Sequence, residues 1–161
     1  MHRGYPRAVP ATKVPPAARV AVLAWYADRG RSLAFRGTRD PYAVLVSEAM
    51  AQQTQAGRAA AYWERFMERF PTIEVLAAAS PADVLRAWQG LGYDRRALAL
   101  WRTARIVVAD HAGRLPSTLA ELEALPGIGP YTARAVAAIA FGLGRRGRRQ
   151  RPPRARPDRR W

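Results

Sequence analysis

Apolar residues recur at helical spacing along most of the chain, and this pattern limits the fold more than any other feature of the sequence. No strand-like alternation of useful length interrupts it. The expected helices cover residues 16–29, 42–52, 56–70, 81–88, 97–108, 118–125 and 131–141. Short loops that contain Gly or Pro separate them. The sequence therefore predicts an all-α domain over residues 17–144.

Local signals support several of these helices. Ser80 and Pro81 read as an N-cap residue followed by a proline in the first turn. Thr118, with Glu121 three residues later, matches a capping box. The stripe formed by Trp63, Phe66 and Phe70 is typical of a buried helix face, so we expect core packing rather than an exposed stacking platform.

Composition excludes several classes of protein. The 161 residues suffice for one domain with its own core. No apolar run approaches the length of a membrane span, and residues 1–16, an expected flexible arm, lack the apolar core of a signal peptide. Cysteine is absent, and His2 and His111 have no ligand-type neighbours, so we expect no metal site. These features are typical of a cytoplasmic protein.

The charge is strongly positive and unevenly distributed. Residues 145–161 hold nine arginines and one aspartate, +8 of the total net charge of +15. We expect this segment to be a disordered Arg/Pro-rich tail. The rest of the chain is still basic enough to favour a polyanion such as nucleic acid, although a solvated basic surface would have the same composition.

The string "LPGIGPYTA", residues 125–133, places two glycines and two prolines between two predicted helices. Gly127 and Gly129 can adopt positive φ and let another backbone approach closely. Pro130 suits the first turn of the next helix. Such a turn exposes free N–H groups at a helix N-terminus, which is a favourable site for a phosphate. An ordinary tight turn between two helices is the alternative.

These motifs resemble those of one enzyme family. "LPGIGPYTA" resembles the helix-hairpin-helix of DNA repair glycosylases. "SEAMAQQTQ", residues 47–55, and "GLGYDRRAL", residues 90–98, are similar to segments of the adenine DNA glycosylases, which remove adenine mispaired with 8-oxoguanine. The resemblance covers about residues 17–144. It implies the helix-hairpin-helix DNA glycosylase fold in incomplete form, with the six-helix lobe mostly present and the second lobe largely missing.

Glu48 is the candidate catalytic residue. Its helical neighbours include Val44, Leu45 and Ala49, and a carboxyl group among apolar side chains should have a raised pKa. A carboxylic acid that stays protonated near neutrality can act as a general acid. A surface or helix-capping glutamate is the alternative. The resemblance implies that Glu48 protonates the extruded adenine and then handles the attacking water.

The resemblance also implies a set of DNA-binding residues. Gln52 and Tyr93 would insert beside the orphaned 8-oxoguanine. Arg36 would contact the flipped base or its phosphates, although a plain surface arginine is the alternative. The hairpin contributes Gly127, Gly129, Tyr131 and Thr132. The family usually has a second tyrosine where this chain has Asp94, so the local fit there is poorer.

Tyr131 bears on the type of reaction. Endonuclease III, a relative within the superfamily, carries a lysine there as a Schiff-base nucleophile. A tyrosine favours simple hydrolysis of the glycosidic bond, so we expect a monofunctional adenine glycosylase acting on double-stranded DNA with an adenine:8-oxoguanine or adenine:guanine mispair. The alternatives are a non-catalytic helix-hairpin-helix DNA-binding module and an endonuclease III-like lyase.

Several parts of the family pattern have no counterpart here. These are the catalytic aspartate in a segment like "VVDGNVRRVLAR", the four-cysteine loop of a [4Fe-4S] cluster, and the C-terminal domain that reads 8-oxoguanine. We therefore expect no cofactor in this chain and little or no excision activity. The residues leave the oligomeric state open, and we expect a monomer only if the chain is soluble.

A frameshift is our hypothesis for the tail. With CGN arginine codons and one allowed choice of third bases, "RRQRPPRARP", residues 148–157, reads "DGNVRRVLAR" one nucleotide later. That is the missing aspartate segment. A genuine basic arm that grips DNA is the alternative.

Overall fold

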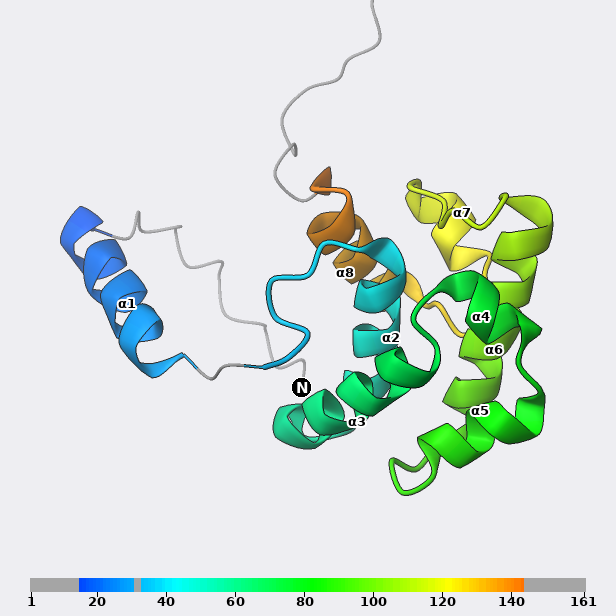
Figure 1. Ribbon diagram of the computed structural model, residues 1–161. Coiled ribbons are helices and arrows are strands. Elements are labelled where there is room, and N and C mark those ends of the chain that lie inside the picture. The colour runs from blue at the N-terminus through cyan, green and yellow to red at the C-terminus, as the bar shows by residue number, and fades with distance from the viewer. Residues whose placement is uncertain (1–14, 31–32, 144–161) are drawn as a thin grey trace, which may run out of the picture. The chain divides into compact units, whose positions relative to one another are not determined.

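The computed structural model describes residues 15–30 and 33–143, and the chain divides into two compact units, Met1–Ser32 and Leu33–Trp161. The first unit contains α1 (Pro16–Arg29), which begins with proline in its first turn and has no buried residue (Figure 1). Its exposed apolar side chains include Val20, Leu23 and Trp25. The predicted tail, 145–161, and most of the predicted arm, 1–16, lie outside the described residues.

The second unit is built from helices, and its described residues contain no strand, which confirms the predicted all-α class. Its helices are α2 (Pro41–Ala51), α3 (Ala56–Arg69), α4 (Ile73–Ala78), α5 (Pro81–Trp88), α6 (Asp94–Asp110), α7 (Leu119–Glu123) and α8 (Pro130–Ala140). The six-residue α4 is the one helix among them that the apolar pattern did not predict. Its N-cap residue is Thr72, whose side chain accepts a hydrogen bond from the Val75 N–H.

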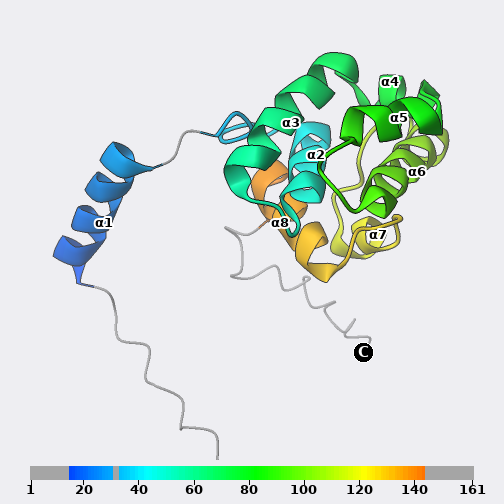
Figure 2. The ribbon, with the colours of Figure 1, turned by 90° about the horizontal axis from the view of Figure 1, so that it is seen from below.

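α2 lies inside the second unit, beside α3, α6 and α8 (Figures 1 and 2). Six consecutive residues, 42–47, are buried, as is Met50. A helix that is apolar on most of its circumference needs neighbours on several sides, and α2 has them. The central position of α2 means that the residues at its exposed end are held by a rigid core.

The aromatic stripe of α3 is core, as predicted. Phe66 and Phe70 are buried, and Phe66 meets Trp88 edge-on with ring centroids 5.9 Å apart. Trp63 is half-buried, and its indole N–H donates to the Ala43 carbonyl at 3.0 Å. The stripe therefore joins α3 to both α2 and α5.

The predicted N-caps are confirmed. The Ser80 hydroxyl accepts the Asp83 N–H at 3.1 Å. The Thr118 hydroxyl accepts the Glu121 N–H at 3.3 Å and donates to the Glu121 carboxylate. The two bonds from N–H groups each satisfy a backbone donor that the first helical turn leaves without an intrahelical partner.

The hairpin between α7 and α8 contains two glycines with different roles. Gly127 has φ +75°, and a Cβ there would lie 2.6 Å from the Ala99 Cβ on α6, so positive φ and close packing both require glycine. Gly129 differs from the expectation. It is the N-cap residue of α8 with φ −84°, and nothing lies within 4 Å of where its Cβ would be. At Gly129 the missing side chain therefore leaves open space beside the start of α8, and the backbone there is not in a conformation that requires glycine.

None of the described helices combines the length and the apolar character that crossing a bilayer would require.

Candidate active site and nucleic-acid interface

Glu48 lies on α2, three residues before the helix ends. Its side chain is half-buried, and burial raises the pKa of its carboxyl group above the ordinary value, in the predicted direction. Within residues 15–30 and 33–143, no hydrogen bond or ion pair reaches this carboxyl group to offset the desolvation. The group therefore holds its proton more tightly than a surface glutamate does.

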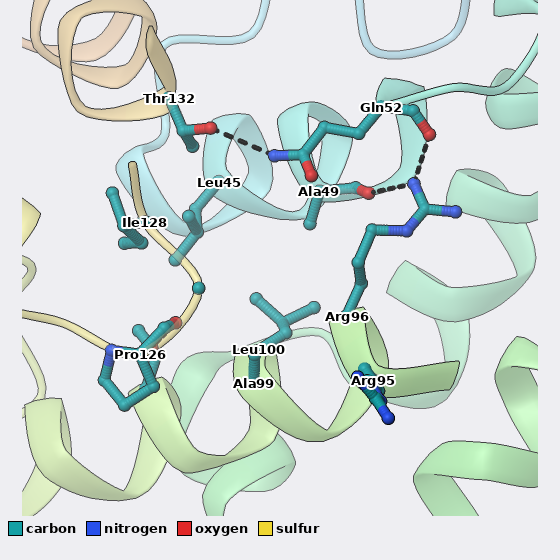
Figure 3. Close-up of a pocket in the computed structure, with 12 residues that line it drawn as sticks. Leu45, Ala49, Gln52, Arg95, Arg96, Ala99, Leu100, Pro126, Ile128 and Thr132 are labelled. Atoms are coloured by element: carbon teal, nitrogen blue, oxygen red, sulfur yellow. Dashed lines mark hydrogen bonds between the residues drawn. The ribbon is translucent and has the colours of Figure 1, made fainter. Parts of the chain in front are cut away.

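A cavity of about 360 Å³ lies between α2, α6 and the hairpin loop (Figure 3). Leu45 and Ala49 of α2 and the C-cap residue Gln52 line it, and their spacing places them on one side of the helix. Glu48 is not among them, because its Cβ starts about 60° round the helix axis from that of Leu45. Glu48 thus lies on the helix face next to this cavity rather than inside it.

The Gln52 side chain points across the cavity to the hairpin helix. Its amide nitrogen donates to the Thr132 hydroxyl oxygen at 3.0 Å (Figure 3). Thr132 is 4% exposed, so its hydroxyl group faces the protein interior. The structure therefore brings together two of the predicted DNA-binding residues, and it ties the end of α2 to the first turn of α8.

Two non-glycine residues beside this bond have left-handed backbones. Gln53 has φ +55° and Tyr93 has φ +56°, and both side chains are exposed. Both residues line one open hollow of about 790 Å³, together with Gln52, Asp94, Arg95 and Arg96. Such backbones are strained for residues with a Cβ, and they tend to occur at functional sites.

The apolar pattern did not single out Gln53. The helix was predicted to continue to residue 52, whereas α2 ends at Ala51, so the turn begins one residue earlier and Gln53 occupies its tip. The repeated glutamine in "AQQTQ" is the signal that could have drawn attention to it.

The loop that carries Tyr93 is fixed from several sides. The Arg58 guanidinium donates to the Gly90 carbonyl. The Trp88 indole N–H donates to the Gly92 carbonyl at 3.1 Å, and the Arg96 guanidinium donates to the same oxygen at 3.2 Å. Tyr93 is 63% exposed at the N-cap position of α6.

Asp94 follows Tyr93 in the first turn of α6, where the positive end of the helix dipole stabilises a negative charge. This position explains how the fold accommodates an acid where the family usually has a tyrosine.

The N-terminus of α8 is open. Its N-cap residue, Gly129, has no side chain to cap the free N–H groups, and Tyr131 is 75% exposed in the first turn. Arg36 is exposed in the turn of residues 34–37, before α2, and it lines neither the cavity nor the hollow. The cavity therefore brings Gln52, Gly127 and Thr132 together, and the hollow joins Gln52 to Tyr93, whereas Glu48, Gly129, Tyr131 and Arg36 line neither.

The described part of the chain contains no group of three or more His, Cys, Asp or Glu side chains that could hold a metal ion.

Two helices joined by the glycine hairpin, the second of them packed on a buried helix that carries a half-buried glutamate, define a helix-hairpin-helix protein. A family model described as the HhH-GPD superfamily of base excision DNA repair proteins matches residues 46–157. The chain belongs to this superfamily.

Individual relatives agree with this family. The chain is 47% identical over 121 residues to the adenine DNA glycosylase of Mycobacterium tuberculosis, covering 74% of this chain and 40% of the relative. It is 42% identical over 133 residues to the human adenine DNA glycosylase, covering 77% of this chain and 24% of the relative. The chain thus spans less than half the length of these relatives.

Solved structures share the fold. A thermostable thymine-DNA glycosylase superposes with a TM-score of 0.69 at 30% identity, covering 76% of this chain and 57% of that one. Endonuclease III in a non-covalent DNA complex superposes with a TM-score of 0.64 at 20% identity, covering 79% and 60%.

The iron–sulfur cluster that the family resemblance implies does not fit this chain. Such clusters are held by cysteine thiolates, and the sequence has no cysteine.

Proposed function

We propose that this chain carries the acid-bearing helix and the DNA-binding hairpin of an adenine DNA glycosylase. The reaction would hydrolyse the N-glycosidic bond of adenine mispaired with 8-oxoguanine or guanine. The observation that carries the proposal is the half-buried Glu48 carboxyl group with its raised pKa, on the helix that ends at Ala51, directly before Gln52 and Gln53.

The chemistry follows from that carboxyl group. Adenine is a poor leaving group until one of its ring nitrogens is protonated, and Glu48 would supply the proton. The resulting carboxylate would then accept a proton from the attacking water. The target base must leave the duplex to reach this group. Tyr93 would then fill the space by stacking, a contact worth about 1–3 kcal/mol per base.

The hairpin would hold the DNA backbone. The uncapped first turn of α8 offers free N–H groups, and the open space beside Gly129 lets a phosphate approach them. Contacts of this kind fix the position of the protein on DNA without reading sequence. Arg36 remains a proposed contact to the flipped nucleotide, and the partner we propose is duplex DNA with an adenine:8-oxoguanine mispair.

We further propose that this chain alone has little or no excision activity. A second carboxylate stabilises the oxocarbenium-like sugar in glycoside hydrolysis. The only acid after Glu123 in this sequence is Asp158. A non-catalytic DNA-binding module is therefore the second candidate function, and this absence of a second acid is what favours it.

A glycosylase assay separates the two. A duplex with one adenine:8-oxoguanine pair would be incubated with this chain, and with a version in which "DGNVRRVLAR" replaces residues 148–157 and the shifted reading frame continues. Adenine release by the extended version, and its loss in the extended Glu48→Gln variant, would support the glycosylase. If the extended version binds the duplex but releases no adenine, the chain is a binding module. Strand nicking without alkali would indicate a lyase and contradict the argument from Tyr131.

A further inference from the structure

Arg96 contacts backbone carbonyls from two separate turns. Its Nη1 donates to the Ala49 carbonyl at 2.9 Å and to the Gln52 carbonyl, both at the C-terminal end of α2 (Figure 3). Its Nη2 donates to the Gly92 carbonyl at 3.2 Å, in the loop before α6. One guanidinium group therefore joins the end of the helix that carries Glu48 to the loop that carries Tyr93.

The geometry requires an arginine. The last carbonyls of a helix lack intrahelical donors, and here the planar guanidinium supplies them. The Arg96 Cζ lies 5.8 Å from the centroid of the Trp88 ring and 5.0 Å from that of the Tyr93 ring. A lysine ammonium group is a compact charge without the planar, spread-out donors of a guanidinium group, so it could not donate hydrogen bonds to carbonyls of both turns at once.

The two joined turns contain the two strained tips. Gln53 follows Gln52 directly, and Tyr93 follows Gly92 directly, so each left-handed residue is next to a carbonyl that Arg96 holds. Strained backbones of this kind persist only when the surrounding structure fixes them. The Arg96 side chain is the contact that the two turns share.

We propose that Arg96 is a positioning residue that fixes the Gln53 and Tyr93 turns relative to each other, so that both tips enter the DNA duplex together. The inference rests on the proposed function insofar as DNA is the ligand. Removal of this side chain takes a hydrogen bond from both turns at once, although the two tips are forty residues apart in the sequence.

The first test needs no DNA. Amide hydrogen exchange of the full chain would be compared for the native protein, Arg96→Lys, Arg96→Ala and Arg102→Ala, the last removing an exposed arginine from the same helix. In both Arg96 variants, exchange should rise about tenfold in residues 52–55 and 90–94, because one lost hydrogen bond to a charged group changes an opening equilibrium by about that factor. Exchange in α4 and α7 should not change, and Arg102→Ala should match the native protein.

Three results would overturn the proposal. Faster exchange in only one turn would mean that Arg96 does not join them, and unchanged exchange in both would mean that it holds neither. Faster exchange throughout α4 and α7 in Arg96→Lys, which keeps the charge and most of the bulk, would show a general structural role instead.

The second test adds a duplex with 2-aminopurine beside an adenine:8-oxoguanine pair. Entry of the tips unstacks the probe and raises its fluorescence. At saturating protein, Arg96→Lys should give at least about a threefold smaller rise, while its affinity differs from the native value by no more than about tenfold, the factor for one lost contact. An undiminished rise would overturn the proposal. If the native chain itself gives no rise, the proposed function fails, whereas the exchange result still decides the positioning role.

Discussion

The two hairpin glycines give a pair of substitutions that should affect different properties, the first the stability of the fold and the second the affinity for DNA. In Gly127→Ala, the new alanine must keep the left-handed backbone conformation at φ +75°, which costs about 1–2 kcal/mol for a residue with a Cβ. The same Cβ would lie 2.6 Å from the Ala99 Cβ, and relief of that overlap by backbone movement costs about 1–3 kcal/mol. We therefore expect the free energy of unfolding to fall by about 2–5 kcal/mol.

Gly129→Ala is the matched control, because φ there is −84° and no atom lies within 4 Å of the new Cβ. Its free energy of unfolding should change by less than about 0.5 kcal/mol. Its affinity for duplex DNA should fall nonetheless, because the methyl group occupies the space through which a phosphate would approach the first turn of α8.

Urea unfolding followed by circular dichroism measures the stabilities, and fluorescence anisotropy with a labelled duplex measures the affinities. The clash at Gly127 can be isolated with a double-mutant cycle. Ala99→Gly should restore at least about 1 kcal/mol to Gly127→Ala beyond the sum of the single effects. Equal urea midpoints for the Gly127 and Gly129 variants would refute the reasoning, as would a coupling energy of zero.

Three further perturbations test other parts of the structure. Glu48 has a folded-state pKa above its unfolded value, so its contribution to stability is complete below the unfolded pKa and is lost as pH rises through the folded pKa. Glu48→Gln should accordingly be more stable than the native chain at neutral pH and equal to it at acidic pH, as thermal melts across pH would show. Tyr42→Phe removes a buried hydroxyl that donates to the Phe70 carbonyl at 2.8 Å, and urea unfolding should show a loss of about 1–2 kcal/mol. Thr118→Ala removes the N-cap of α7, and the same measurement should show a loss of about 1 kcal/mol, whereas no loss would mean that the cap bond is not formed in solution.

The exposed apolar side chains of α1 lead to a prediction about association. Val20, Leu23 and Trp25 are 65%, 58% and 63% exposed, and exposed large apolar side chains favour contacts between molecules. Analytical ultracentrifugation should show more association of the native chain than of a variant with Leu23→Glu and Trp25→Glu. Identical sedimentation of the two would contradict this.

The helices could be predicted from the sequence because their signals are local. The helix start at Ser80–Pro81 and the N-cap at Thr118 depend only on residues that are close together in the sequence, and both are present in the structure. The α4 helix was missed because its six residues are too few to show an apolar period, although Thr72 is a good N-cap residue.

The features of the candidate site also divide into those that neighbouring residues determine and those that depend on distant parts of the chain. The burial of Glu48 and its raised pKa could be predicted because its helical neighbours are apolar. The hydrogen bonds of Arg96 could not be predicted, because they depend on where carbonyls 47 and 44 residues away point. The left-handed turn at Gln53 escaped prediction for a related reason, since its position depends on a helix end one residue earlier than the pattern indicated.

The hydrogen bond between Gln52 and Thr132 joins residues that are eighty positions apart. During synthesis, α2 leaves the ribosome long before its partner does, and domains generally fold from the N-terminal side as the chain emerges. The surface around Gln52 is therefore assembled late in translation, after the hairpin has emerged. A nascent chain arrested before residue 132 would expose the unsatisfied Gln52 amide and the apolar side of α2 to chaperones, and it could engage no substrate until the hairpin had docked.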